Sequence, residues 1–352
     1  MSCLILVMSD LRPVLAQLAD GARLTEQEAE NAFAIIMSGS ADLAQMAAFI
    51  MALRVRGETV DEIVGGARVL RAKAASLNGP DHIVDTCGTG GDGTGTYNIS
   101  TAAAIVAAAA GAVVAKHGNR SVSSKSGSAD VLMALGANLE MSQQANEQSL
   151  LDNGFAFMFA PAHHKAMRHV APARGSLQLR TIFNLLGPLA NPAHTKRQIL
   201  GVFDKKWLLP MAQVLQKLGS EHVWVVHGSD GLDEITTTGD TFVAELKDGQ
   251  ISEFTLNPAD IGLTTASLKD LQGGDADVNA AAMRAVLRGD ASSYRDIVLM
   301  NTGAALVVAG VVDSFEDGVE RAAQAIDSGA ADALLSRWIA FTNANLPEPE
   351  NG

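Results

Sequence analysis

Basic side chains are scarce in this 352-residue sequence. Lysine and arginine number 26 against 39 aspartates and glutamates, which gives a formal net charge of −13 at pH 7. Nucleic acids and anionic membrane surfaces are bound by basic protein faces. The charge therefore argues against both as general partners, and a polyanionic small molecule has to be met by a local group of cations.

Cysteine is nearly absent as well. The two cysteines, Cys3 and Cys87, have no paired spacing, which argues against a disulfide framework or a zinc site and fits a reducing cytosol. We therefore expect a cytoplasmic protein in which Cys87 is a small buried thiol.

Long apolar runs of the kind that enter membranes are also missing. The stretch "MSCLILVM" has no basic segment before it and is followed closely by Asp10, which is not the pattern of a signal peptide. The run "AAAIVAAAAGAVVA" is interrupted by Gly111 and is too short to span a bilayer. We interpret it as an interior segment.

Aromatic residues make up only 5% of the chain, whereas glycine occurs 33 times and hydrophobic residues reach 47%. This composition favours closely packed helices and backbone-lined turns over a sandwich of long strands. The length corresponds to about two domains at roughly 150 residues each. We expect a globular protein of the α/β class.

A small α-helical domain is predicted for residues 1–77. Thr25 with Glu28 three residues later has the pattern of a capping box, and Asp42 and Thr59 open two further stretches with helical spacing. Four helices are expected before a boundary near Leu77. We expect helices from about 168–190 to join this domain.

A larger α/β domain is predicted for residues 78–352. Short apolar runs such as "AVVAKHG", "FAFMFAP", "QILGVFD" and "HVWVVHG" alternate with helical stretches, the pattern of a mostly parallel central sheet flanked by helices. A hairpin is expected around Asp248 and Gly249, and a helical tail from Asn279 to Asn345.

The stretch "DTCGTGGDGTGTYNIST" holds Gly88, Gly90 and Gly93 at the spacing of a dinucleotide-binding turn. Such a turn runs directly into its helix and is followed about 20 residues later by an acidic residue. Neither holds here, because the loop continues to Tyr97 and the next charged residue is Lys116. Asp92 inside the turn would also repel a diphosphate unless a metal ion or sugar hydroxyls lay between them.

Two following segments indicate a phosphate of another kind. "NIST" places hydroxyl and amide side chains at the start of an Ala-rich helix, where free N–H groups attract anions, although ordinary helix capping explains the same pattern. The segment "KHGNRSVSSKSGSAD" then brings Lys116, Arg120, Lys125 and several serines together in an acidic protein. Such a loop suits phosphate oxygens better than a merely solvated surface loop does.

A third segment, "HGSDGLDEITTTG", follows the predicted strand "HVWVV". Adjacent Asp233 and Glu234 at a strand end suit Mg²⁺, which is commonly held by one or two carboxylates together with phosphates and waters. Adjacent acids in loops are otherwise usually solvated. His227 is interpreted as a structural histidine.

These segments, together with "HHKAM" and "RTIFNLLGPLANP", closely resemble in order and spacing the anthranilate phosphoribosyltransferase family of the tryptophan pathway. The likeness covers essentially the whole chain, and its glycine-rich and KHGNRS segments are highly specific. The more distant pyrimidine nucleoside phosphorylases share the architecture but carry different loops.

The resemblance implies transfer of phosphoribose from 5-phosphoribosyl diphosphate (PRPP) to the amine of anthranilate, with Mg²⁺. It implies small-molecule substrates and a homodimer formed through the helical domain. The chemistry suits positioning and electrostatics, with Lys116 as an electrostatic group and no obligatory protein nucleophile.

By position, the resemblance implies three sets of site residues. The PRPP set is Gly88, Gly91, Asp92, Thr96, Asn98, Ile99, Ser100, Thr101, Lys116, His117, Gly118, Asn119, Arg120, Ser121, Val122, Ser123, Ser124 and Ser128. The anthranilate set is Gly88, His117, Asn119, His164, Arg174 and Pro188. The metal set is Ser100, Asp233 and Glu234.

The sequence departs from the family pattern at two places. Arg174 lies in "ARGSLQ" where relatives carry a run like "RKELG", and Lys165 replaces the proline of "HHPAM". A nucleoside phosphorylase that uses inorganic phosphate and a non-catalytic relative that binds nucleic acid or regulates are the competing hypotheses.

Overall fold

The computed structural model describes residues 10–121 and 125–345, and it divides them into two compact units. The helical unit comprises residues 10–74 and 164–190, and the α/β unit comprises residues 75–163 and 191–345. The helical unit is therefore built from two separate stretches of chain, and each unit is described by itself below.

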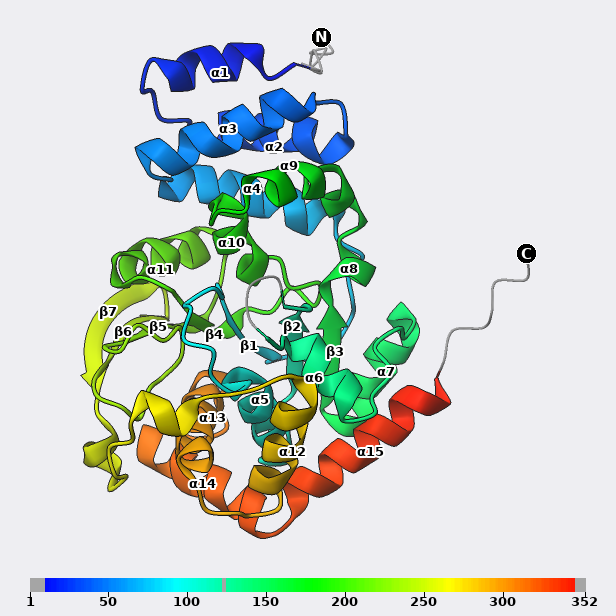
Figure 1. Ribbon diagram of the computed structural model, residues 1–352, viewed down its shortest axis with the longest axis vertical. Coiled ribbons are helices and arrows are strands. Elements are labelled where there is room, and N and C mark those ends of the chain that lie inside the picture. The colour runs from blue at the N-terminus through cyan, green and yellow to red at the C-terminus, as the bar shows by residue number, and fades with distance from the viewer. Residues whose placement is uncertain (1–9, 122–124, 346–352) are drawn as a thin grey trace. The chain divides into compact units, whose positions relative to one another are not determined.

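The helical unit contains the four helices predicted from the sequence and further helices from its second stretch (Figure 1). Its elements are α1 (Arg12–Ala19), α2 (Glu26–Ser38), α3 (Leu43–Arg56), α4 (Val60–Lys73), η1 (Lys165–His169), α9 (Ala171–Leu177), α10 (Ile182–Leu186) and η2 (Gly187–Leu189). Thr25 forms the predicted capping box at α2, and Asp42 and Thr59 stand at the starts of α3 and α4 as predicted. The structure shows that Thr59 forms a capping box as well.

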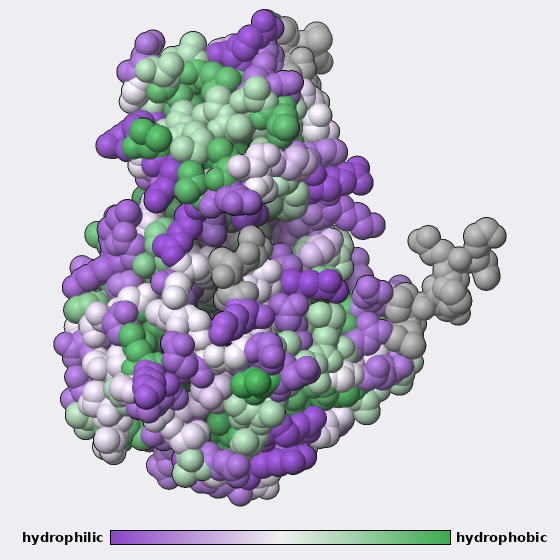
Figure 2. Space-filling model, in the orientation of Figure 1, coloured by the Kyte–Doolittle hydropathy of each residue, from purple (hydrophilic) through white to green (hydrophobic). Residues whose placement is uncertain are grey.

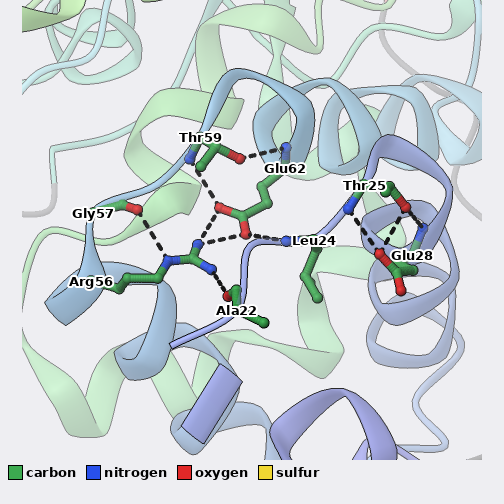
Figure 3. A network of polar contacts seen from close by, with 8 residues as sticks. All are labelled: Ala22, Leu24, Thr25, Glu28, Arg56, Gly57, Thr59 and Glu62. Carbon is green, nitrogen blue, oxygen red and sulfur yellow. Dashed lines mark hydrogen bonds and ion pairs between the residues drawn. The ribbon is translucent and has the colours of Figure 1, made fainter. Parts of the chain in front are cut away.

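One capping residue of this unit also forms a buried ion pair. Glu62 of α4 is completely buried, and its carboxylate accepts hydrogen bonds from the backbone N–H groups of Leu24 (3.0 Å) and Thr59 (2.9 Å). The Arg56 guanidinium binds both carboxylate oxygens and also donates to the carbonyl of Ala22 (Figure 3). These contacts join the ends of α3 and α4 to the segment before α2.

The core of the helical unit is aromatic at its centre. The Phe33 ring packs edge-on against Phe49 (5.4 Å between ring centroids) and against Phe183 (5.8 Å). Glycine at position 65 lets α4 approach α2 closely, since a Cβ there would lie 2.7 Å from the Ala29 Cβ. Residues from both stretches of the chain therefore complete one core.

The α/β unit is built on a seven-stranded sheet with the order β3-β2-β1-β4-β5-β6-β7. Its strands are β1 (Val84–Gly88), β2 (Val114–Gly118), β3 (Phe155–Phe159), β4 (Arg197–Gly201), β5 (His222–Gly228), β6 (Thr241–Lys247) and β7 (Gln250–Leu256). The first five run parallel, and β6 and β7 form the antiparallel hairpin predicted around Asp248 and Gly249.

Helices flank this sheet, as predicted for an α/β domain. They are α5 (Ile99–Ala109), α6 (Ser128–Ala134), α7 (Gln143–Asn153), α8 (Ala160–His163), η3 (Lys205–Trp207), α11 (Leu208–Lys217), η4 (Pro258–Ile261), η5 (Leu268–Leu271), α12 (Ala276–Leu287), α13 (Ser293–Ala309), α14 (Phe315–Asp327) and α15 (Ala330–Ala344). No helix among the described residues has the length and apolar character needed to cross a bilayer.

Alternation along the strands gives the sheet two apolar faces. Val114, Phe155 and Phe157 belong to the large core that contains α5 and α13, whereas Ala115 and Ala156 pack on the other side with Leu150 of α7. A sheet buried on both faces leaves its strand ends as the places where loops can carry polar chemistry.

Candidate functional site

The strand order creates a switch point at β1. From β1 the chain builds β2 and β3 on one side, and it then returns to place β4 on the other side. Ligands of open α/β sheets bind outside the carboxyl ends of the strands at such a point. Here those ends are Gly88 of β1 and Gly201 of β4, which are paired in register.

The glycine-rich loop leaves β1 at this point. Gly90, Gly91, Gly93 and Gly95 have φ angles of 66°, 72°, 80° and 67°, a backbone conformation that other residues rarely adopt. Asp92 turns back on the loop, since its carboxylate accepts hydrogen bonds from the Thr94 N–H (3.2 Å) and hydroxyl (2.6 Å). The loop is thus shaped by its backbone, as a phosphate-binding loop requires.

The far half of the loop is fastened to the segment before α12. Thr96 forms an antiparallel β-bridge with Gln272, and the Gln272 side chain donates to the carbonyl of Thr94 (2.7 Å). The backbone N–H of Tyr97 donates to the carbonyl of Leu271 (3.1 Å). Tyr97 also stacks on Tyr294 at 4.4 Å between ring centroids.

Helix α5 begins where "NIST" predicts. Asn98 precedes its first residue, but the Asn98 side chain forms no capping hydrogen bond. Its Nδ2 donates to the carbonyl of Ser126 (3.2 Å), and its Oδ1 accepts from Asn279 (3.0 Å). Asn98 therefore ties the glycine-rich loop to the serine-rich loop after β2.

The amino end of α5 already holds an acidic side chain. The backbone N–H of Ser100 donates to Oε1 of Glu234 at 3.1 Å. Free N–H groups and the helix dipole favour an anion at this position. The loop after β5 thus reaches the start of α5, although the two lie more than a hundred residues apart in the sequence.

Asp233 lies against the ends of β1 and β4. Its Oδ2 accepts a hydrogen bond from the Gly90 N–H at 2.7 Å. A Cβ at Gly88 would lie 2.5 Å from that oxygen, and a Cβ at Gly201 would collide with the Asp233 backbone. Glycine at these two strand ends is what allows Asp233 to enter the switch point.

Glu234 has a strongly shifted pKa. Removal from water is the main cause, and the neighbouring charge of Asp233 is the second; together they raise the pKa of Glu234 from 4.5 to about 8. Lys116 and hydrogen bonds from Ser100 act in the opposite direction. The two adjacent acids therefore repel each other in the protein alone, and a cation would relieve that repulsion.

Lys116 is buried beneath this site. Its side chain is only 2% exposed, and its ammonium donates to the carbonyl of Thr86 in β1. Burial lowers the pKa of Lys116, while the charges of Asp85 and other neighbours, including both loop acids, oppose the shift. Lys116 thus supplies a buried positive charge that interacts with Asp233 and Glu234.

Asp85 lies on β1 between several donors. Its carboxylate accepts from the backbone N–H of His117 (3.0 Å) and from Nδ2 of Asn191 (2.8 Å). Burial raises the pKa of Asp85, and Lys116 is the largest opposing influence. These contacts hold the end of β2 to β1, and with it the start of the KHGNRS segment.

The loop after β2 folds back on itself. Asp130 accepts from the N–H groups of Ser121 (3.0 Å) and Gly127 (2.9 Å), and Ser128 donates to the carbonyl of Asn119 (3.2 Å). The Arg120 guanidinium lies 5.8 Å from the centre of the Phe159 ring. The predicted positions Val122, Ser123 and Ser124 lie outside the described residues.

The remaining predicted residues lie in both units. Ile99 and Thr101 are buried in the first turn of α5, and Gly118 ends β2. His164, Arg174 and Pro188 belong to the helical unit.

Arg174 is half-buried in α9 of the helical unit. Its guanidinium lies 5.5 Å from the centre of the Phe183 ring, and burial lowers its pKa. His164 is 7% exposed, and Pro188 is buried in η2.

Comparisons with known proteins cover both units. Residues 12–74 match the glycosyl transferase family helical bundle domain, and residues 80–332 match the glycosyl transferase family a/b domain. The anthranilate phosphoribosyltransferase of Azospirillum brasilense is 58% identical over 96% of this chain and 95% of its own length.

The chain belongs to the anthranilate phosphoribosyltransferase family.

Solved structures of anthranilate phosphoribosyltransferases have the same fold. The enzyme from Thermus thermophilus superposes with a TM-score of 0.88 at 42% identity, covering 94% of this chain and 99% of its own. The enzyme from Saccharomyces cerevisiae in complex with PRPP and Mg gives a TM-score of 0.87 at 29% identity, covering 95% and 98%. The predicted fold class and family are thereby confirmed.

The side chains at the switch point are of the type that binds Mg²⁺. Asp233 and Glu234 offer two carboxylates close to the N–H groups of the glycine-rich loop and α5, and Mg²⁺ takes one or two carboxylates plus phosphates and waters. Among residues 10–121 and 125–345, no three His, Cys, Asp or Glu side chains cluster as an all-protein metal site.

Sequence reasoning missed the residues that hold this site from behind. Gln272, Asn279 and Tyr294 bind the glycine-rich loop or Asn98. Asn279 and Tyr294 lie in the predicted helical tail and Gln272 lies shortly before it, where no local motif marks them. Asp85 is the first residue of the quoted stretch "DTCGTGGDGTGTYNIST". A charged residue in a buried strand is the signal that could have identified it.

Proposed function

We propose that this chain transfers the phosphoribosyl group of PRPP to the amine of anthranilate, giving phosphoribosylanthranilate and diphosphate in tryptophan biosynthesis. The observation that carries the proposal is the convergence at one switch point of a glycine-rich loop, the amino end of α5 and the acid pair Asp233 and Glu234. Membership of the anthranilate phosphoribosyltransferase family supports the same reaction.

We assign the PRPP site to the loops of the α/β unit. The N–H groups of the glycine-rich loop and of α5 suit phosphate oxygens, and Asp92 suits ribose hydroxyls or water. The KHGNRS loop adds the cation Arg120 and several hydroxyls. The residues assigned are the members of the PRPP set predicted from the sequence. They lie within residues 88–101 and 116–124, and Ser128 completes the set.

We assign Mg²⁺ binding to Ser100, Asp233 and Glu234, and we propose that the activity requires it. When bound, the cation neutralises charge on the diphosphate leaving group. The protein's part is to keep the two carboxylates together at the start of α5, where Ser100 fixes Glu234 and Gly90 fixes Asp233.

The reaction exchanges one bond for another at ribose C1. The C1–O bond to diphosphate breaks and its electron pair leaves with the diphosphate, while the anthranilate nitrogen lone pair forms the new C1–N bond and the amine loses a proton. Positive charge develops on the ribosyl ring and negative charge on the leaving group. The positive charge of buried Lys116, whose ammonium binds the Thr86 carbonyl of β1, favours that departing negative charge.

For Gly88, His117, Asn119, His164, Arg174 and Pro188 we propose the anthranilate-binding role that the family resemblance implies. The planar guanidinium of Arg174 is suited to a carboxylate, and it lies 5.5 Å from the centre of the Phe183 ring. Lys165 adds a charge next to His164 where relatives carry proline.

We also propose a cytoplasmic homodimer formed through the helical unit. Hydrophobic residues gather over the α-helices of this unit in Figure 2, and Leu43 and Val55 of α3 are 48% and 81% exposed. A Val55→Glu variant that runs as a monomer in light scattering, beside a dimeric parent, supports this assignment; two dimers of equal stability contradict it.

The test of the reaction is the loss of anthranilate fluorescence when the purified protein is mixed with anthranilate, PRPP and Mg²⁺. We expect consumption that stops with EDTA and resumes with added Mg²⁺. If the folded protein consumes no anthranilate, the assignment fails, and phosphate-dependent cleavage of nucleosides is the next reaction to measure.

A further inference from the structure

Helix α13 contacts two parts of the proposed metal and PRPP site, namely the end of the glycine-rich loop and the loop that carries Asp233 and Glu234. Tyr294 and Asn301 are seven residues apart, so they lie two turns apart on one side of the helix. Their exposed fractions are both 3%. One contacts the end of the glycine-rich loop, and the other contacts the loop that carries the acid pair.

Asn301 binds the residue that follows Glu234. Its Oδ1 accepts from the Ile235 N–H at 3.0 Å, and its Nδ2 donates to the Ile235 carbonyl at 2.8 Å. The same Nδ2 donates to the Ile297 carbonyl of α13 at 2.8 Å. Both donors and the acceptor of the amide are therefore used, and the side chain has one orientation that satisfies them.

Tyr294 binds the end of the glycine-rich loop. Its hydroxyl donates to the carbonyl of Asn98 at 3.2 Å, immediately before α5. Its ring stacks on Tyr97 with an angle of 18° between the planes. The spacing along α13 thus relates the backbone at Ile235 to the backbone at Asn98.

An amide at position 301 is not needed for packing alone. The neighbours of Asn301 on α13 are almost all buried hydrophobic residues, and burying an amide among them costs free energy unless its hydrogen bonds are made. Two of its three hydrogen bonds go to a loop residue, Ile235, which is itself fully buried. The amide and the loop backbone satisfy each other.

We propose that Asn301 is a positioning residue for the metal-binding carboxylates, and that α13 sets the distance between Glu234 and the amino end of α5. The proposal rests on the proposed function, since it takes Asp233 and Glu234 as metal ligands. Asn301 touches neither carboxylate and acts through the Ile235 backbone. Partners of metal ligands at this remove change metal affinity by about 10- to 100-fold when they are altered.

The test compares Asn301→Leu with Thr302→Val. Leucine has a similar size but makes none of the three hydrogen bonds. Thr302 is the next residue of α13, is equally buried and donates to the carbonyl of Ala103 in α5 at 3.4 Å, so its variant loses a buried hydrogen bond that does not reach the acid loop. Asn301→Ser is the second variant, for use if the leucine protein does not fold.

Two readouts separate positioning from stability. The first is the Mg²⁺ concentration for half-maximal anthranilate consumption at saturating substrates; the second is the affinity for Mn²⁺ in the presence of inorganic diphosphate, measured by spin resonance without turnover. We expect both to weaken about 10-fold or more in the Asn301 variants. The rate at saturating Mg²⁺ recovers most of the parent value, and Thr302→Val shifts neither readout.

Each other result has a defined meaning. The proposal is overturned if the folded Asn301 variants have the same apparent Mg²⁺ requirement and the same Mn²⁺ affinity as the parent. It is also overturned if the parent binds no Mn²⁺ in the presence of diphosphate. A parent that binds Mn²⁺ with diphosphate but consumes no anthranilate removes the proposed function alone. In that case, weaker Mn²⁺ binding by the Asn301 variants still supports the positioning role.

Discussion

Glu62 of the helical unit and Glu234 of the α/β unit both approach the amino end of a helix, but their surroundings differ. Glu62 is completely buried and is held by Arg56 and by two backbone N–H groups. Glu234 is partly exposed, takes its hydrogen bonds from Ser100 and stands beside Asp233. Among the described residues, Glu234 forms no ion pair with a lysine or arginine.

The difference indicates two uses of an acidic side chain at the start of a helix. A carboxylate whose oxygens are fully matched by donors and a cation holds helices together and has little capacity for a ligand. A carboxylate placed next to another acid costs stability unless something positive arrives. The first arrangement is structural, and the second is typical of a site that waits for a metal with its substrate.

Removing the acid pair should have the largest effect on function. Asp233→Ala with Glu234→Ala is expected to lower the rate of anthranilate consumption by at least about 10³-fold, because charge on the leaving group loses its stabilisation. The urea midpoint should stay near the parent value or rise, since the repulsion between the acids is gone. Full activity in this variant would remove the metal assignment.

Breaking the structural pair should have the opposite profile. Arg56→Leu leaves Glu62 buried without its cation and should lower the free energy of unfolding by about 3–5 kcal/mol. The specific activity of the folded fraction should be unchanged at low temperature. Arg56→Leu combined with Glu62→Gln is the control, and it should recover much of the loss in urea unfolding; an unchanged single variant would contradict the structural role.

A substitution at the switch point should reduce activity with little loss of stability. In Gly88→Ala the added Cβ meets Oδ2 of Asp233, so the carboxylate has to move away from the Gly90 N–H. We expect the apparent Mg²⁺ requirement to rise about 10-fold, in keeping with the cost of disturbing a metal ligand. Gly187→Ala is a control at a helical-unit glycine where a Cβ meets nothing within 4 Å; equal effects in the two variants argue against the steric explanation.

The last prediction concerns pH dependence in EDTA. With a pKa near 8 in the folded protein and near 4.5 when unfolded, Glu234 keeps a proton on folding that the unfolded chain has lost. The stability of the metal-free protein should therefore fall as pH rises from about 4.5 to about 8. Urea unfolding across this range should show a weaker decline in Glu234→Gln, and an identical decline in both proteins contradicts the assignment.

Local features of the fold were predictable from the sequence. The capping box at Thr25, the helix start at Thr59 and the turn at Asp248 depend on neighbouring residues, and the structure has them where the sequence predicts. The start of α5 after Asn98 follows from the change from glycine to an Ala-rich run. Such signals are complete within a few positions of the chain.

The contacts that position the site were not predictable in this way. Asp233 against Gly88 and Asn301 against Ile235 join segments that meet only after the sheet has formed. The sequence identified Lys116 as a basic group beside phosphate chemistry, but only the structure shows it bonded to the Thr86 carbonyl under the loop. The direction of a side chain depends on packing that no single segment encodes.

The divided helical unit has a consequence for synthesis of the chain. Phe183 and Leu186 complete the core around Phe33 and Gly66, yet they leave the ribosome after the first three strands of the other unit. Chains grow at about 5–20 residues per second, so the first four helices wait many seconds with an unfinished apolar face. Conditions that slow translation between residues 74 and 164 should lengthen the period in which the nascent chain depends on chaperones.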